Sequence, residues 1–183
     1  MKKYAMIAIV AMSMTIAACG NSGSIGNSGS NADDSKKGKE APVAYEQIKI
    51  EKYGASFDLP KGMRRTDNPQ MDNGGAWTFV PEDYFFAIDA AVDFSVYESI
   101  FGDYTDERIQ REFDEDLPEE AVKTLDLAKK EYRYSVDGEN KEFHRVIFKD
   151  NKSINVMVVY TDEWASKLGG EVCEHVLNSA KFD

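Results

Sequence analysis

Apolar residues recur at every second position in several stretches of residues 44–183, and this period is that of a β-strand. The clearest stretch is residues 84–97, where the alternate positions are small or polar. We therefore expect a strand with one face in the core and the other partly solvated. Its apolar positions are Phe86, Ile88, Ala90, Val92, Phe94 and Val96.

Further strands are predicted on either side of residues that favour turns. Two short strands flank Gly54, one strand stops at Pro81, and two long ones form a hairpin across Asp137-Gly138. Residues 154–160 are apolar on nearly both faces, which indicates the centre of the sheet. Residues 67–75, rich in Pro, Asn and Gly, are predicted to form a loop. The other predicted strands cover residues 48–50, 57–59, 76–80, 127–136 and 142–149.

Helices are predicted in two regions. Thr105 is a candidate N-cap for a helix with Ile109 and Phe113 on one face, and Pro118 is expected to start a second segment. A terminal helix is expected from residue 161 or 162, because apolar residues recur there every four positions. The predicted fold class is α+β, a mainly antiparallel sheet with packed helices. The terminal stripe is Trp164, Leu168, Val172, Val176 and Ala180.

The amino terminus has the pattern of a secretory signal, with two lysines before an apolar run over residues 4–18. A helix of about 15 residues rises about 22 Å, which is short of the roughly 30 Å hydrocarbon core of a bilayer. Residues 1–18 are therefore predicted to be a signal peptide. A plain signal cleaved at a small-residue site is one alternative.

The next residue makes a more specific interpretation possible. Ile16-Ala17-Ala18-Cys19 resembles the bacterial lipobox. The resemblance implies that Cys19 is acylated, that the chain is cut before it, and that a lipid bilayer is a partner. Two or three acyl chains hold a soluble domain on a membrane stably, whereas one chain does so only marginally.

Residues 19–43 are predicted to be a flexible tether, because their Gly, Ser and Asn residues cannot bury enough surface to order the chain. Its reach is about 25–30 Å. Gly20 is not the Asp that marks inner-membrane retention in enteric bacteria, so an outer membrane is favoured if the host has two membranes. Asp33-Asp34 beside lysines resembles the surface-export signal of Bacteroidota lipoproteins, but this signal lies closer to the Cys there. The sequence does not distinguish an anchor on the periplasmic side of that membrane from one on the cell surface.

The folded part, residues 44–183, resembles the Mog1/PsbP-like fold in its order of elements and in two short motifs. These motifs are Leu59-Pro60-Lys61-Gly62 and the ending from Asn178 to Phe182. The resemblance implies an α/β/α sandwich. Members of this fold include photosystem accessory subunits and a GTPase-binding protein, so the fold alone implies no function and no site residues.

Composition and charge narrow the classes of function. Hydrophobic residues make up 42 % and charged residues 30 % of the chain, which excludes a polytopic membrane protein and a disordered chain. The chain has 33 acidic residues against 22 Lys and Arg, a net charge of −11. This charge repels nucleic acid and favours a basic partner, with association that weakens as salt rises.

Candidate chemistry is sparse. His144, His175 and Cys173 have no metal-ligand spacing, and no phosphate or dinucleotide motif occurs, so neither a metal nor a cofactor nor a catalytic set is expected. Asp89 and Asp93 share a predicted strand face but stand about 13 Å apart, too far for a glycosidase pair. Together with Tyr97 they are the candidate ligand-binding residues.

The expected function is that of a lipid-anchored cell-envelope protein that binds or supports another envelope component without catalysis. One alternative is a small-ligand-binding or hydrolytic domain that uses an acidic cleft at Asp89 and Asp93. Another is an immunity-type protein that neutralises a basic toxin.

Overall fold

The computed structural model describes residues 42–66, 72–84 and 89–183. The chain divides into two units, Met1–Lys39 and Glu40–Asp183, and every described residue belongs to the second unit. The predicted signal peptide and Cys19 lie outside the described residues, as do Phe86 and Ile88. No described helix is both long and apolar enough to span a bilayer.

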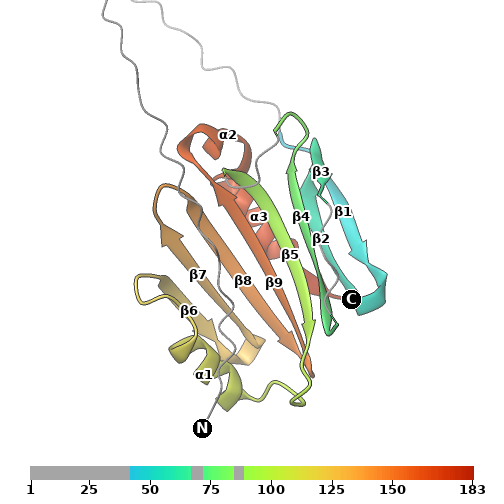
Figure 1. Cartoon of the computed structure of the whole chain (residues 1–183), viewed down its shortest axis with the longest axis vertical. Helices are drawn as coiled ribbons and strands as arrows, with labels where there is room; N and C mark the ends of the chain where they lie inside the picture. The colour runs from blue at the N-terminus through green and yellow to red at the C-terminus, as the bar shows by residue number, and fades with distance from the viewer. Residues whose placement is uncertain (1–41, 67–71, 85–88) are drawn as a thin grey trace, which may run out of the picture. The chain divides into compact units, whose positions relative to one another are not determined.

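A seven-stranded antiparallel sheet, the large sheet, forms the body of the fold (Figure 1). Its strands are β3 (Met63–Arg65), β4 (Gly74–Pro81), β5 (Ala90–Glu98), β6 (Val122–Asp126), β7 (Glu131–Asp137), β8 (Lys141–Lys149) and β9 (Lys152–Tyr160). Their order is β3-β4-β5-β9-β8-β7-β6. The central position predicted for residues 154–160 is therefore confirmed.

A second, three-stranded sheet has the order β1-β2-β10 and is also antiparallel. It consists of β1 (Tyr45–Ile50), β2 (Ala55–Pro60) and the short β10 (Lys181–Phe182). The pair around Gly54 was predicted, whereas β10 was not, because two residues carry no periodicity. The amino-terminal and carboxy-terminal parts of the described chain thus pair in one sheet.

Three α-helices complete the domain: α1 (Asp106–Glu115), α2 (Ala165–Leu168) and α3 (Glu171–Ser179). The α1 helix starts as predicted, because the Thr105 hydroxyl accepts the backbone N–H of Arg108 at 3.3 Å. The prediction of a single terminal helix was wrong. The chain breaks between α2 and α3, where Gly170 takes a φ of 55° that favours glycine.

Three further boundaries differ from the predictions. The segment after Pro118 forms strand β6 instead of a helix, and residues 127–129 form a 3₁₀ turn before β7. Gly74 and Gly75 belong to β4 instead of a loop. A Cβ on Gly74 would lie 2.2 Å from the carbonyl oxygen of Val96, so only glycine allows this close strand pairing.

The main core lies between one face of the large sheet and a layer made of the small sheet and α3. Phe57 of β2 stacks on Phe94 of β5 with ring centroids 4.4 Å apart, and Val176 of α3 is fully buried. The α1 helix packs on the opposite face, where Ile109 joins side chains of β7 and β8. The α+β prediction is confirmed, and helices contact both faces of the sheet.

Candidate binding site

The face of the large sheet that carries α1 is called the open face here. Cross-strand register places Thr78 of β4, Asp93 of β5 and Met157 of β9 side by side, with His144 of β8 next to Met157. Asn155 lies two residues before Met157 in β9 and therefore on the same face. Four neighbouring strands of the sheet therefore supply one group of side chains.

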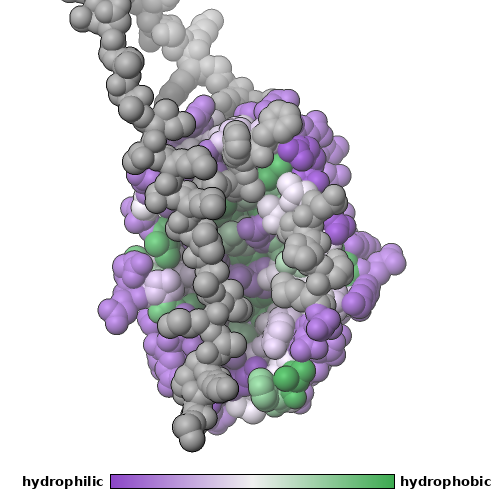
Figure 2. Space-filling model, viewed as in Figure 1, coloured by the Kyte–Doolittle hydropathy of each residue, from purple (hydrophilic) through white to green (hydrophobic). Residues whose placement is uncertain are grey.

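A cleft of about 320 Å³ on the open face is bordered by Thr78, Asp93, Asn155 and Met157, whereas His144 is not part of its lining. Figure 2 looks onto this face and shows hydrophilic and hydrophobic residues together in its hollowed middle. The cleft therefore combines an apolar wall with a few polar groups, as small binding sites commonly do. Its lining includes Ala76, Trp77, Thr78, Asp93, Ser95, Asn155 and Met157.

Three residues of this face, the polar row, have buried polar atoms that lack a well-formed hydrogen bond. The Oδ1 atoms of Asp93 and Asn155 and both ring nitrogens of His144 have no well-formed hydrogen bond to any described residue. A buried polar atom left unpaired costs about 1–3 kcal/mol. The polar row therefore lowers the stability of the fold as it stands, and such sites call for an explanation.

Burial also favours the neutral forms of Asp93 and His144 in the polar row. Desolvation raises the pKa of Asp93, and a hydrogen bond with Thr78 offsets this only in part. Desolvation lowers the pKa of His144. Glu142, whose Oε2 lies 3.5 Å from Nε2, and the neighbouring Asn155 act in the opposite direction. The imidazole stacks on the Tyr134 ring with centroids 4.1 Å apart, which holds it in place.

Of the three predicted ligand-binding residues, Asp93 alone lines the cleft among the described residues. Asp89 precedes β5 and accepts a hydrogen bond from the Tyr84 hydroxyl. Tyr97 lies on the open face but pairs with Gly74 at the far end of β5, and is 39 % exposed. The structure thus does not bring the three together.

Asn155 and His144 were not among the predicted site residues. The available signal was Asn155, a polar residue inside the apolar run of residues 154–160. A buried polar side chain in a central strand usually has a hydrogen-bond partner or a functional role. Its neighbours, however, are known only once the register is known.

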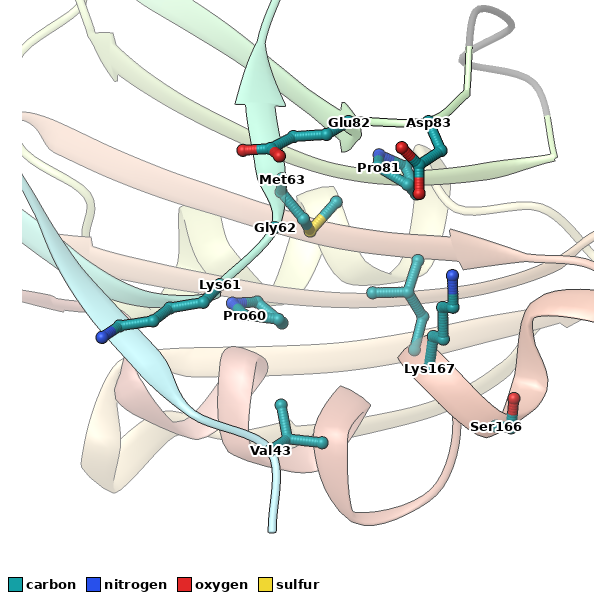
Figure 3. A pocket seen from close by; sticks show the side chains of 11 residues that line it. Val43, Pro60, Lys61, Gly62, Met63, Pro81, Glu82, Asp83, Ser166 and Lys167 are labelled. Carbon is teal, nitrogen blue, oxygen red and sulfur yellow. The ribbon is translucent and has the colours of Figure 1, made fainter. Parts of the chain in front are cut away.

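A second cavity, of about 430 Å³, lies between the β2–β3 turn, the end of β4 and α2 (Figure 3). The buried part of its lining consists of Pro60, Met63, Pro81 and Leu168. Its charged side chains, of both signs, are exposed and therefore hydrated without a ligand. No atom of its lining is among the unpaired buried atoms of the described residues, so the cleft on the open face is the stronger candidate. The charged residues are Lys61, Glu82, Asp83 and Lys167.

Cys173 packs in the main core, where burial raises the pKa of its thiol to about 12. A thiol in this state is a poor nucleophile at neutral pH. Within the described part of the chain, no group of three or more His, Cys, Asp or Glu residues is arranged to hold a metal ion.

Comparison with known proteins shows the fold. No family model and no curated protein sequence matches the chain. The solution structure of cyanobacterial PsbP (CyanoP) from Synechocystis sp. PCC 6803 matches with a TM-score of 0.50 and 14 % identity, covering 81 % of this chain and 98 % of that one. The fold is PsbP-like. At this identity the likeness concerns architecture and carries no function.

Two further solved structures resemble the chain more loosely. The Ran-binding protein Mog1p of Saccharomyces cerevisiae has a TM-score of 0.45 and 11 % identity, and the match covers 77 % of this chain and 96 % of that one. A protein from Bacteroides thetaiotaomicron has a TM-score of 0.45 and 13 % identity, covering 71 % of this chain and 45 % of that one.

Proposed function

We propose that this chain is a non-enzymatic binding protein, held at a cell-envelope membrane by acylated Cys19, and that its open face binds another envelope component. The observation that carries the proposal is the polar row. Its unpaired atoms lower the stability of the domain, and a bound group that supplies hydrogen bonds would remove that cost.

The position of the cleft supports a binding role. Its residues lie on strands of a sheet whose other face is packed in the main core, so the side chains are held in place before anything binds. A site ordered in advance loses little conformational entropy on binding. The excess of acidic residues over Lys and Arg favours a basic component as the partner.

The anchor rests on the lipobox-like residues alone. Intact-mass measurement of the protein purified from its host's membranes is expected to show a chain that begins at Cys19 and carries acyl groups. A Cys19→Ser variant is expected to leave the membrane fraction or to keep residues 1–18. An uncut chain, or a free thiol at Cys19 of the native protein, would overturn the anchor.

The open face can be tested in living cells with a photo-crosslinking amino acid at Ser95, which lines the cleft. The matched control carries the same group at Lys49, an exposed residue of β1 in the small sheet. We expect a discrete protein adduct from position 95 that is absent from position 49. The same adducts at both positions, or none at position 95, would refute binding at the open face. An adduct below about 1 kDa would favour the small-ligand alternative over a protein partner.

A further inference from the structure

The unpaired atoms of the cleft indicate which chemical group it takes. We infer that the cleft binds a primary ammonium group, such as that of a lysine side chain, with Oδ1 of Asp93 and Oδ1 of Asn155 as acceptors. This inference rests on the function proposed above and adds the chemistry of the bound group.

Both unpaired oxygens are hydrogen-bond acceptors, so neither can satisfy the other. They lie on neighbouring strands and on the same face, because Ser95 pairs with Asn155 and Asp93 precedes Ser95 by two residues. Diagonal neighbours of this kind stand about 7 Å apart at their Cα atoms, which long side chains bridge. A ligand that satisfies both oxygens must therefore bring more than one donor.

The charge of the cleft favours a cation among donors. Asp93 is the one ionisable side chain in the described lining, so no lysine or arginine there competes for its carboxylate. Desolvation makes the ionised carboxylate costly, and burial raises its pKa. A cation in contact with it would offset that cost, whereas a neutral donor would offset only the missing hydrogen bond.

The geometry favours ammonium over guanidinium. A guanidinium binds best through two parallel bonds to both oxygens of one carboxylate. Here Thr78 already forms a hydrogen bond with the Asp93 carboxyl group, and Oδ1 is the oxygen of Asp93 that stays unpaired. An ammonium group has three divergent donors and can reach acceptors on two strands. Ala76 and Met157 then offer an apolar wall to the methylene stem.

The test uses the full chain and two probes of nearly equal shape, N-acetyl-lysine methylamide and N-acetyl-norleucine methylamide. Binding is followed by backbone amide NMR shifts at Asp93, Asn155 and their neighbours. We expect saturable binding of the lysine probe, and affinity for the norleucine probe lower by about tenfold or more, the scale of one lost charge-assisted hydrogen bond. N-acetyl-arginine methylamide is expected to bind more weakly than the lysine probe.

Two variants locate the binding. Asp93→Asn and Asn155→Leu should each weaken the lysine probe by about tenfold, and Asp103→Asn, a matched change at an exposed acid, should leave it within about twofold. Equal binding of the lysine and norleucine probes, no binding of either, or an unchanged affinity in Asp93→Asn overturns the inference. These outcomes are separate from the crosslinking result. An adduct from position 95 without amine binding supports the proposed function and refutes the ammonium site. Amine binding without a protein adduct supports the ammonium site and refutes a protein partner at the open face.

Discussion

Replacing Asp93 with Asn is expected to stabilise the domain at neutral pH. The two side chains have nearly the same shape, but Asn carries no charge. Burial raises the pKa of Asp93, so its ionised form is the one that the fold penalises. A buried polar group without its partner costs about 1–3 kcal/mol, and more when it is charged. We therefore expect Asp93→Asn to raise the free energy of unfolding by about 1–2 kcal/mol at pH 7.

The gain should depend on pH in a defined direction. The folded-state pKa of Asp93 lies above the unfolded value, about 3.9, so the folded chain binds more protons between the two values. The contribution of Asp93 to stability therefore falls as pH rises through this window. The penalty is absent below about pH 3.9 and complete above the folded-state pKa. Asp93→Asn should consequently gain little at pH 3.5 and most at pH 7.

Urea unfolding followed by the fluorescence of Trp77 and Trp164 measures both values. With a slope of about 1–3 kcal/mol per molar urea, a gain of this size moves the midpoint by about 0.3–2 M. Asp103→Asn is the control for the general loss of one negative charge, because Asp103 is exposed. If Asp93→Asn is less stable than the parent at pH 7, or gains equally at both pH values, the ionised Asp93 carboxylate does not lower stability.

Three further predictions concern the rest of the domain. Arg145 donates to Glu131 and to the carbonyl of Leu177 at the end of α3. Arg145→Met should destabilise by about 3–5 kcal/mol in urea unfolding, since it leaves the buried Glu131 carboxylate with Arg133, at 4.0 Å, as its remaining ion-pair partner. The double variant Arg145→Met/Glu131→Met should lose less stability than Arg145→Met alone. An equal or larger loss would contradict the role of the Glu131 charge. Cys173 should react with a thiol reagent only on unfolding, because burial raises its pKa to about 12, and rapid labelling of the folded chain would disprove this. Thr105→Ala should cost about 1 kcal/mol in urea unfolding through the lost cap of α1, and no change would show that the cap contributes nothing.

Local patterns were enough where one element has one exposed and one buried face. The alternation in β5 and the apolar run in β9 report burial directly, because successive side chains of a strand point to opposite faces. Thr105 predicted the start of α1 for an equally local reason. These elements, and with them the α+β class, could be predicted from the chain alone.

Local patterns failed where the backbone conformation depended on distant parts of the chain. The stripe from Leu168 to Val176 is buried as expected, but it spans a break at Gly170, so its spacing alone did not reveal two helices. Strand β6 is short and lies at the edge of the sheet, with Val122 75 % exposed. Its pairing with β7, and not its own composition, makes it a strand.

By itself the sequence determined the strand-rich domain, the central strand, the cap of α1 and the acidic charge, all of which depend on residues within a few positions of one another. The tertiary structure alone decided the cleft and the polar row. Asp93, His144 and Asn155 come from three strands, and only the register of the sheet makes them neighbours. A shift of one residue in one strand would turn its side chain to the other face. The candidate site is therefore a property of the pairing, which no single segment contains.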